Sequence, residues 1–91
     1  MENKRYLDKV IGSLVRSTKM DYDEEEIHFP FLPPFSSIYQ LPLTIVLLPH
    51  SPTLFSFTKY CKDIYGLTVD EVEYVWGEYR DIIKEKVKNE G

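Results

Sequence analysis

The segment TVDEVEYVWGEYRDIIKEKVKN, residues 68–89, carries the clearest structural signal in the sequence and constrains how the rest must fold. Its first four residues fit a capping box, in which the Thr68 hydroxyl accepts a hydrogen bond from the Glu71 N–H while the Glu71 carboxylate reaches back. Acids in the first turn and lysines in the last suit the helix dipole. We therefore predict a helix over about 69–89, with apolar side chains at one-face spacing: Val72, Val75, Trp76, Tyr79, Ile82, Ile83 and Val87.

Two shorter segments have the same periodicity. A helix is predicted over about residues 3–18, and another over about 56–65 with Ser56 as N-cap and Gly66 as a left-handed residue at its end. We predict that the helix over about 56–65 forms a helical hairpin with the 69–89 helix. The apolar stripes are Tyr6, Leu7, Val10, Ile11, Leu14 and Val15 in the first, and Phe57, Tyr60, Cys61 and Ile64 in the second.

An uncharged insert separates the N-terminal helix from the C-terminal hairpin. From Ile27 to Thr58 there is no Asp, Glu, Lys or Arg, yet this window holds all six prolines and all five phenylalanines of the chain. It includes FPFLPPF, residues 29–35. Because two short amphipathic helices cannot cover the long one by themselves, we predict that part of FPFLPPF belongs to the core.

Two stretches of the chain have the pattern of short strands. EEIHFPF, residues 25–31, alternates before its proline, and LTIVLL, residues 43–48, is a β-branched run between prolines. A hairpin between them and an extended coil packed on the helices both agree with this pattern. DYDEEE, residues 21–26, predicts an acidic linker. The predicted fold is a single α-rich small domain, α or α+β, whose Pro/aromatic-rich middle segment has at most a short hairpin.

Charge and hydropathy argue against two classes of partner. The net charge is −4, and the predicted 69–89 helix opens with Asp70, Glu71 and Glu73, which would repel DNA phosphates. LTIVLL is far shorter than a bilayer span. We therefore expect neither nucleic acid nor membrane as a partner. The single Cys61 and an N-terminus without an apolar leader predict a reducing, cytoplasmic location.

The sequence predicts neither a metal nor a cofactor site. DYDEEE fails the calcium-loop pattern, because Glu26 stands where glycine is needed and Leu32 where glutamate is needed. His28, His50 and Cys61 have no zinc-ligand spacing. No glycine-rich phosphate loop and no local nucleophile signature are present. We expect a protein that is not an enzyme.

The leading hypothesis is a non-enzymatic protein-interaction or accessory module that binds a protein partner or itself. Its contact surface would be whatever stays exposed of residues 29–57, with the acidic segment as a rim. On the 69–89 helix, a tyrosine and a mid-helix glycine opposite the apolar stripe indicate a further contact. The candidate residues are Phe29, Phe31, Leu32, Phe35, Tyr39, Asp70, Tyr74, Gly77 and Asp81, and the rim is Asp21, Asp23, Glu24, Glu25 and Glu26.

Two alternative functions stay open. An acidic inhibitor or charge mimic would bind a basic protein through the same rim, with an affinity that falls steeply with salt. A small hydrolase or ligand carrier would use His28 or His50 in an aromatic pocket. In size and in its mixture of charged and uncharged segments, the chain resembles small accessory proteins of large phages.

Overall fold

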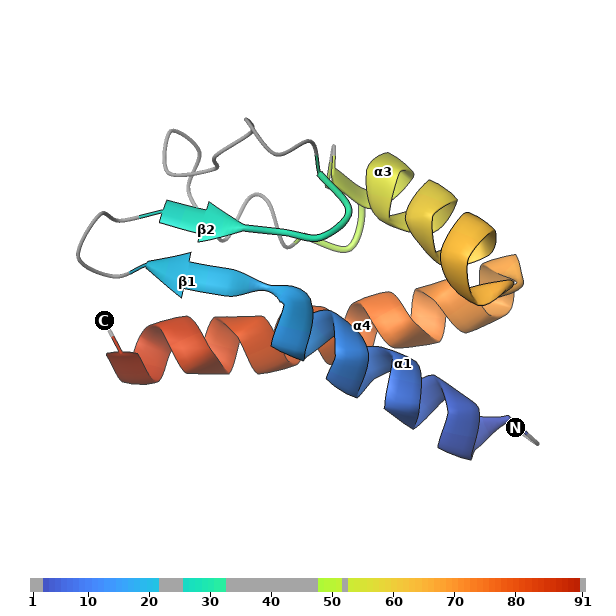
Figure 1. Ribbon diagram of the computed structural model, residues 1–91, viewed down its shortest axis with the longest axis horizontal. Coiled ribbons are helices and arrows are strands. Elements are labelled where there is room, and N and C mark those ends of the chain that lie inside the picture. Colours follow the sequence, from blue (N-terminus) through green and yellow to red (C-terminus); the bar gives the residue numbers. More distant parts are fainter. Residues whose placement is uncertain (1–2, 22–25, 33–47, 52, 91) are drawn as a thin grey trace.

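The computed structural model describes residues 3–21, 26–32, 48–51 and 53–90 and confirms an α-rich small fold. In Figure 1 the N-terminal helix crosses the long C-terminal helix, the paired strands follow the N-terminal helix, and the helix over 53–60 lies above the C-terminal one. The elements in chain order are α1 (Lys4–Ser17), β1 (Lys19–Asp21), β2 (Glu26–His28), α3 (Thr53–Tyr60), the π-helical turn η1 (Cys61–Tyr65) and α4 (Val69–Glu90). Among the described residues, no helix combines the length and apolar content required to cross a bilayer.

The start of α4 has the predicted capping box. The Thr68 N–H donates to Glu71 Oε1 over 2.9 Å, and the Glu71 N–H donates to Thr68 Oγ1 over 3.3 Å. Asn3, just before α1, donates from Nδ2 to Glu71 Oε2 over 3.1 Å. The pKa of Glu71 is lowered first by the Thr68 N–H and then by Asn3, because both bonds favour the ionised carboxylate. One carboxylate thus joins the starts of both long helices.

The apolar face of α1 packs on α4. Leu7, Val10, Ile11 and Leu14 are buried, as their spacing predicts. Tyr6 belongs to the same predicted stripe but is 44% exposed, because its hydroxyl reaches outward to donate to the Tyr65 carbonyl over 2.7 Å.

A pair of hydroxyls holds the end of α1 against α4. The Thr18 hydroxyl donates to the Leu14 carbonyl over 2.8 Å, so the Tyr79 phenol is the donor in the bond between Thr18 Oγ1 and Tyr79 Oη. Tyr79 is fully buried, and burial raises its pKa. The phenol therefore stays protonated at neutral pH and keeps this bond.

The strand predicted within residues 25–31 exists as β2. β2 pairs antiparallel with β1, in the register Lys19↔His28, Met20↔Ile27 and Asp21↔Glu26. The prediction of a linker over 21–26 is wrong at both ends, because main-chain ladder bonds form whatever the side-chain charge. Residues 22–25 lie outside the described residues, as do residues 43–47 of the predicted LTIVLL strand.

The helix predicted over about 56–65 begins earlier than expected. α3 starts at Thr53, so Ser56 lies inside the helix and is not its N-cap. Ser51 precedes the helix, with its hydroxyl 2.7 Å from that of Thr53 and its carbonyl accepting from the Leu54 N–H over 3.0 Å. At the other end, η1 stops at Gly66 as predicted, where φ is 67°.

FPFLPPF supplies core residues, as predicted. Phe29 and Phe31 are 4% and 7% exposed. The Phe31 ring lies 5.1 Å from those of Phe29 and Phe57, measured between centroids, and both Trp76 and Tyr79 are also neighbours of Phe31, at 6.2 and 6.0 Å. These five rings close the space between the hairpin end, α3 and α4.

Candidate functional site

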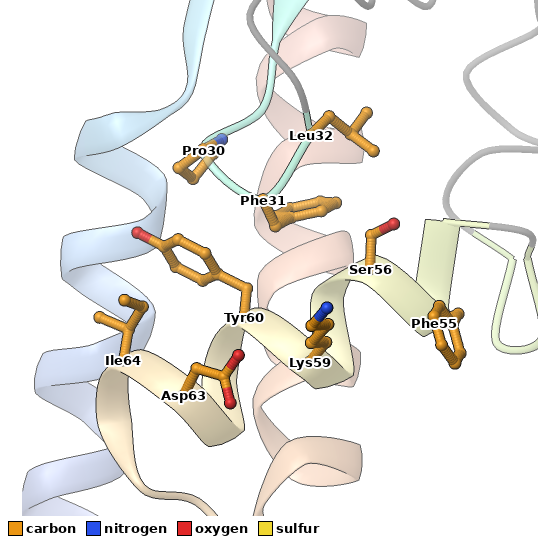
Figure 2. Close-up of a pocket in the computed structure, with 9 residues that line it drawn as sticks. All are labelled: Pro30, Phe31, Leu32, Phe55, Ser56, Lys59, Tyr60, Asp63 and Ile64. Atoms are coloured by element: carbon orange, nitrogen blue, oxygen red, sulfur yellow. The ribbon is translucent and has the colours of Figure 1, made fainter.

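A groove lies between α3, η1 and the segment that follows β2. It has a volume of about 450 Å³, and we call it the α3 groove. Figure 2 shows its lining, with Phe31 between the segment of Pro30 and Leu32 and the side chains of α3 and η1. The lining residues are Pro30, Phe31, Leu32, Phe55, Ser56, Lys59, Tyr60, Asp63 and Ile64.

Two large apolar side chains of this groove face solvent. Phe55 is 80% exposed and Ile64 is 61% exposed, whereas Phe31 of the same lining is buried. Exposure of a single apolar residue is ordinary on a protein surface, but here two of them flank a concave site with a buried aromatic floor. The groove therefore has the chemistry of an apolar contact surface.

The local helix geometry explains why Ile64 is exposed. The spacing of Phe57, Tyr60, Cys61 and Ile64 predicted one buried stripe, and this prediction is wrong for Ile64. Residues 61–65 form a π-helical turn, in which bonds run from i to i+5 and residues five apart share a face. Tyr60 and Tyr65 accordingly meet edge to face, with centroids 6.0 Å apart. Ile64 is thereby turned away from the core.

Opposite charges stand on the outer side of the groove. Lys59 and Asp63 are both exposed and lie one helical turn apart. Figure 2 shows both side chains projecting from the same side of the helix. No ion pair joins Lys59 to Asp63 or to any other carboxylate among the described residues.

Tyr60 places a neutral phenol in the groove. The side chain is half-buried, and burial raises its pKa, with neighbouring Tyr65 raising it further. The phenol therefore stays protonated at neutral pH, and its hydroxyl hydrogen-bonds the Tyr65 side chain.

The predicted contact residues are dispersed in the structure. Phe29 and Phe31 are core residues, and Leu32 is half-buried in the groove lining. On α4, Tyr74 packs against the core, and a Cβ built at Gly77 meets no described atom within 4 Å. The remaining predicted residues are the exposed Asp70 and Asp81, the strand residues Asp21 and Glu26, and Phe35, Tyr39, Asp23, Glu24 and Glu25, which lie outside the described residues.

The predicted contact residues on α4 do not belong to the α3 groove, because none of them lines it: Asp70, Tyr74, Gly77 and Asp81. Sequence reasoning missed Lys59 and Asp63, which lie outside residues 29–57, and did not single out Phe55 within that range. The available signal was Phe55, an aromatic residue out of phase with Phe57 and Cys61, but placing the helix start at Ser56 left Phe55 outside the helix.

The residues considered for catalysis do not assemble a reaction centre in the described part of the chain. His28 lines a separate cavity of about 460 Å³ with Ser17 and Lys19, and His50 is exposed. Cys61 is fully buried, and burial raises the pKa of its thiol to about 12, so it is protonated at neutral pH. Within the described ranges, no three His, Cys, Asp or Glu side chains are grouped as metal ligands would be.

No protein-family model, curated protein or solved structure matches this chain. The geometry of the α3 groove is therefore the basis of the functional proposal.

Proposed function

We propose that this chain is a non-enzymatic interaction module that self-associates as a two-fold dimer through the α3 groove. The observation that carries the proposal is the combination of exposed Phe55 and Ile64 with the charges of Lys59 and Asp63, which have no ion-pair partner in the described part of the chain. The apolar side chains supply affinity, since burying a large apolar side chain is worth about 1.5 to 3 kcal/mol.

The arrangement of charge favours a second copy as the occupant. In a two-fold interface the same patch is used by both partners, so residue i of one copy meets residue j of the other, and the reverse. Antiparallel pairing of two α3 helices would bring Lys59 of each copy to Asp63 of the other. A patch with one cation and one anion a helical turn apart is complementary to itself, and these pairs would fix the orientation.

Charge reversal separates dimerisation from folding. Lys59→Glu brings like charges together at both contacts of a symmetric dimer, and Asp63→Lys does the same with the opposite sign. Each single variant should be monomeric at concentrations at which the unaltered chain dimerises. An equimolar mixture of the two variants should form a mixed dimer, because both contacts then pair opposite charges. Sedimentation velocity at low and high salt measures the mass of the unaltered chain, of each single variant and of their equimolar mixture.

The controls test the surface and the fold independently. Lys62→Glu changes an exposed cation of η1 that does not line the groove and should leave the dimer intact. Phe55→Ser should abolish the dimer while the far-ultraviolet circular dichroism stays unchanged, because Phe55 is 80% exposed. A single-chain mass at the highest soluble concentration would overturn self-association. A dimer that ignores Phe55→Ser and both charge reversals would place the interface elsewhere.

A further inference from the structure

A third cavity lies between α1 and η1, and we call it the α1–η1 cleft. Its volume is about 540 Å³. It shares no lining residue with the α3 groove, so substitutions at different residues test the two sites. Its lining residues are Tyr6, Asp8, Lys9, Val10, Gly12, Ser13, Arg16 and Tyr65.

Hydrogen bonds hold three hydroxyls in this cleft. The Tyr6 phenol donates a hydrogen bond to the Tyr65 carbonyl over 2.7 Å, and Ser13 Oγ lies 3.1 Å from Tyr65 Oη. The Ser13 and Tyr65 hydroxyls carry one hydrogen each, and only one hydrogen can lie between the two oxygens. The Tyr60 side chain also hydrogen-bonds that of Tyr65, so the hydroxyls of Ser13, Tyr60 and Tyr65 share two contacts and one of their three hydrogens is left for a further group. These hydroxyls therefore offer a positioned donor.

Two cations of α1 line the same cleft. Lys9 and Arg16 are seven residues apart, which is two turns and hence one face of the helix. Neither forms an ion pair with a carboxylate among the described residues. Asp8 is the single acid in the lining, so the cleft carries an excess of positive charge on a chain whose net charge is −4.

Gly12 lies beneath the guanidinium of Arg16. A Cβ built at Gly12 would lie 3.3 Å from Arg16 Nη1, which is tighter than ordinary contact. The guanidinium thus lies back along α1, over the position where any other residue would carry a side chain. Glycine within a helix costs about 1 kcal/mol relative to alanine. Gly12, which the helix alone would not favour, thus leaves space for the Arg16 guanidinium.

We propose that the α1–η1 cleft binds a small oxyanion of the phosphate class. A guanidinium presents paired N–H donors that match two oxygens of phosphate, and an ammonium adds a point charge. Arg16 would supply the paired donors, Lys9 the second charge, and the Ser13–Tyr65 pair one hydroxyl donor. Free inorganic phosphate and a phosphate monoester share this chemistry, and they differ in the ester group that a monoester would add to the contact.

The test is a titration of the 15N-labelled chain with sodium phosphate and, separately, with phosphoserine. Ionic strength is held constant with sodium chloride, so that unspecific screening does not change. Saturable amide shifts centred on residues 12, 13 and 65 are expected. Tighter binding of phosphoserine than of phosphate would indicate a monoester as ligand, and the reverse would indicate the free ion.

Three variants separate a built site from diffuse attraction. Arg16→Gln should weaken binding about tenfold through loss of the charged bidentate contact. Gly12→Ala should weaken binding because the added methyl group displaces the Arg16 guanidinium. The melting temperature of this variant should be unchanged or raised, because alanine is the better helix former. Arg5→Gln removes an exposed cation of α1 outside the cleft and should have little effect. Equal losses for Arg5→Gln and Arg16→Gln, or shifts that never saturate, would overturn the proposal.

Discussion

Replacing Phe31 by alanine tests whether FPFLPPF is truly part of the core. The side chain is 7% exposed, and its ring lies 5.1 Å from the rings of Phe29 and Phe57 and 6.2 Å from that of Trp76. Removing a buried phenylalanine loses transfer free energy and leaves a cavity, which together cost about 3 to 5 kcal/mol. Small domains are stable by only about 5 to 15 kcal/mol, so Phe31→Ala should remove a large share of the total.

The matched control is Phe55→Ala, because Phe55 also lines the α3 groove but is 80% exposed. At concentrations at which the chain is monomeric, this change should alter the free energy of unfolding by about 0.5 kcal/mol or less. Phe31→Leu, which keeps most of the apolar volume, should fall between the two, at about 1.5 kcal/mol.

Urea unfolding measures these differences. Trp76 is the only tryptophan of the chain and reports the core by fluorescence, and circular dichroism in the far ultraviolet reports the helices independently. Coincident transitions would justify a two-state analysis. The reasoning would be refuted if Phe31→Ala and Phe55→Ala changed the free energy of unfolding equally, since burial would then not distinguish them.

Three further outcomes are expected from the same unfolding measurements. Thr68→Ala removes the hydroxyl that accepts from the Glu71 N–H and should cost about 1 kcal/mol. Tyr79→Phe leaves the Thr18 hydroxyl without its donor and should cost about 0.5 to 1.5 kcal/mol. The pKa of the Cys61 thiol rises from 9.0 to about 12 on folding. Above about pH 9 this one thiol should therefore lower the free energy of unfolding by at most about 1.4 kcal/mol per pH unit. The unfolded chain then releases a proton that the folded chain retains, and Cys61→Ala should flatten the decline between about pH 9 and 10.

The sequence by itself determined the features that depend on neighbouring residues. The capping box at Thr68 and the left-handed Gly66 both involve bonds that span six residues or fewer, so their pattern is visible in the residue order. The helical stripes are equally local, because one face of a helix recurs every three or four positions. The need to cover the long helix then implied correctly that part of FPFLPPF is buried.

Only the tertiary structure decided which surfaces face solvent and which residues meet across the chain. Pairing of β1 with β2 rests on main-chain bonds, which carry no side-chain signature. Exposure of Ile64 follows from the π-helical turn, and the α1–η1 cleft unites Ser13 with Tyr65, far apart in sequence. These features arise because burial and contact depend on how all the helices pack at once, which the order of residues within any one segment does not specify.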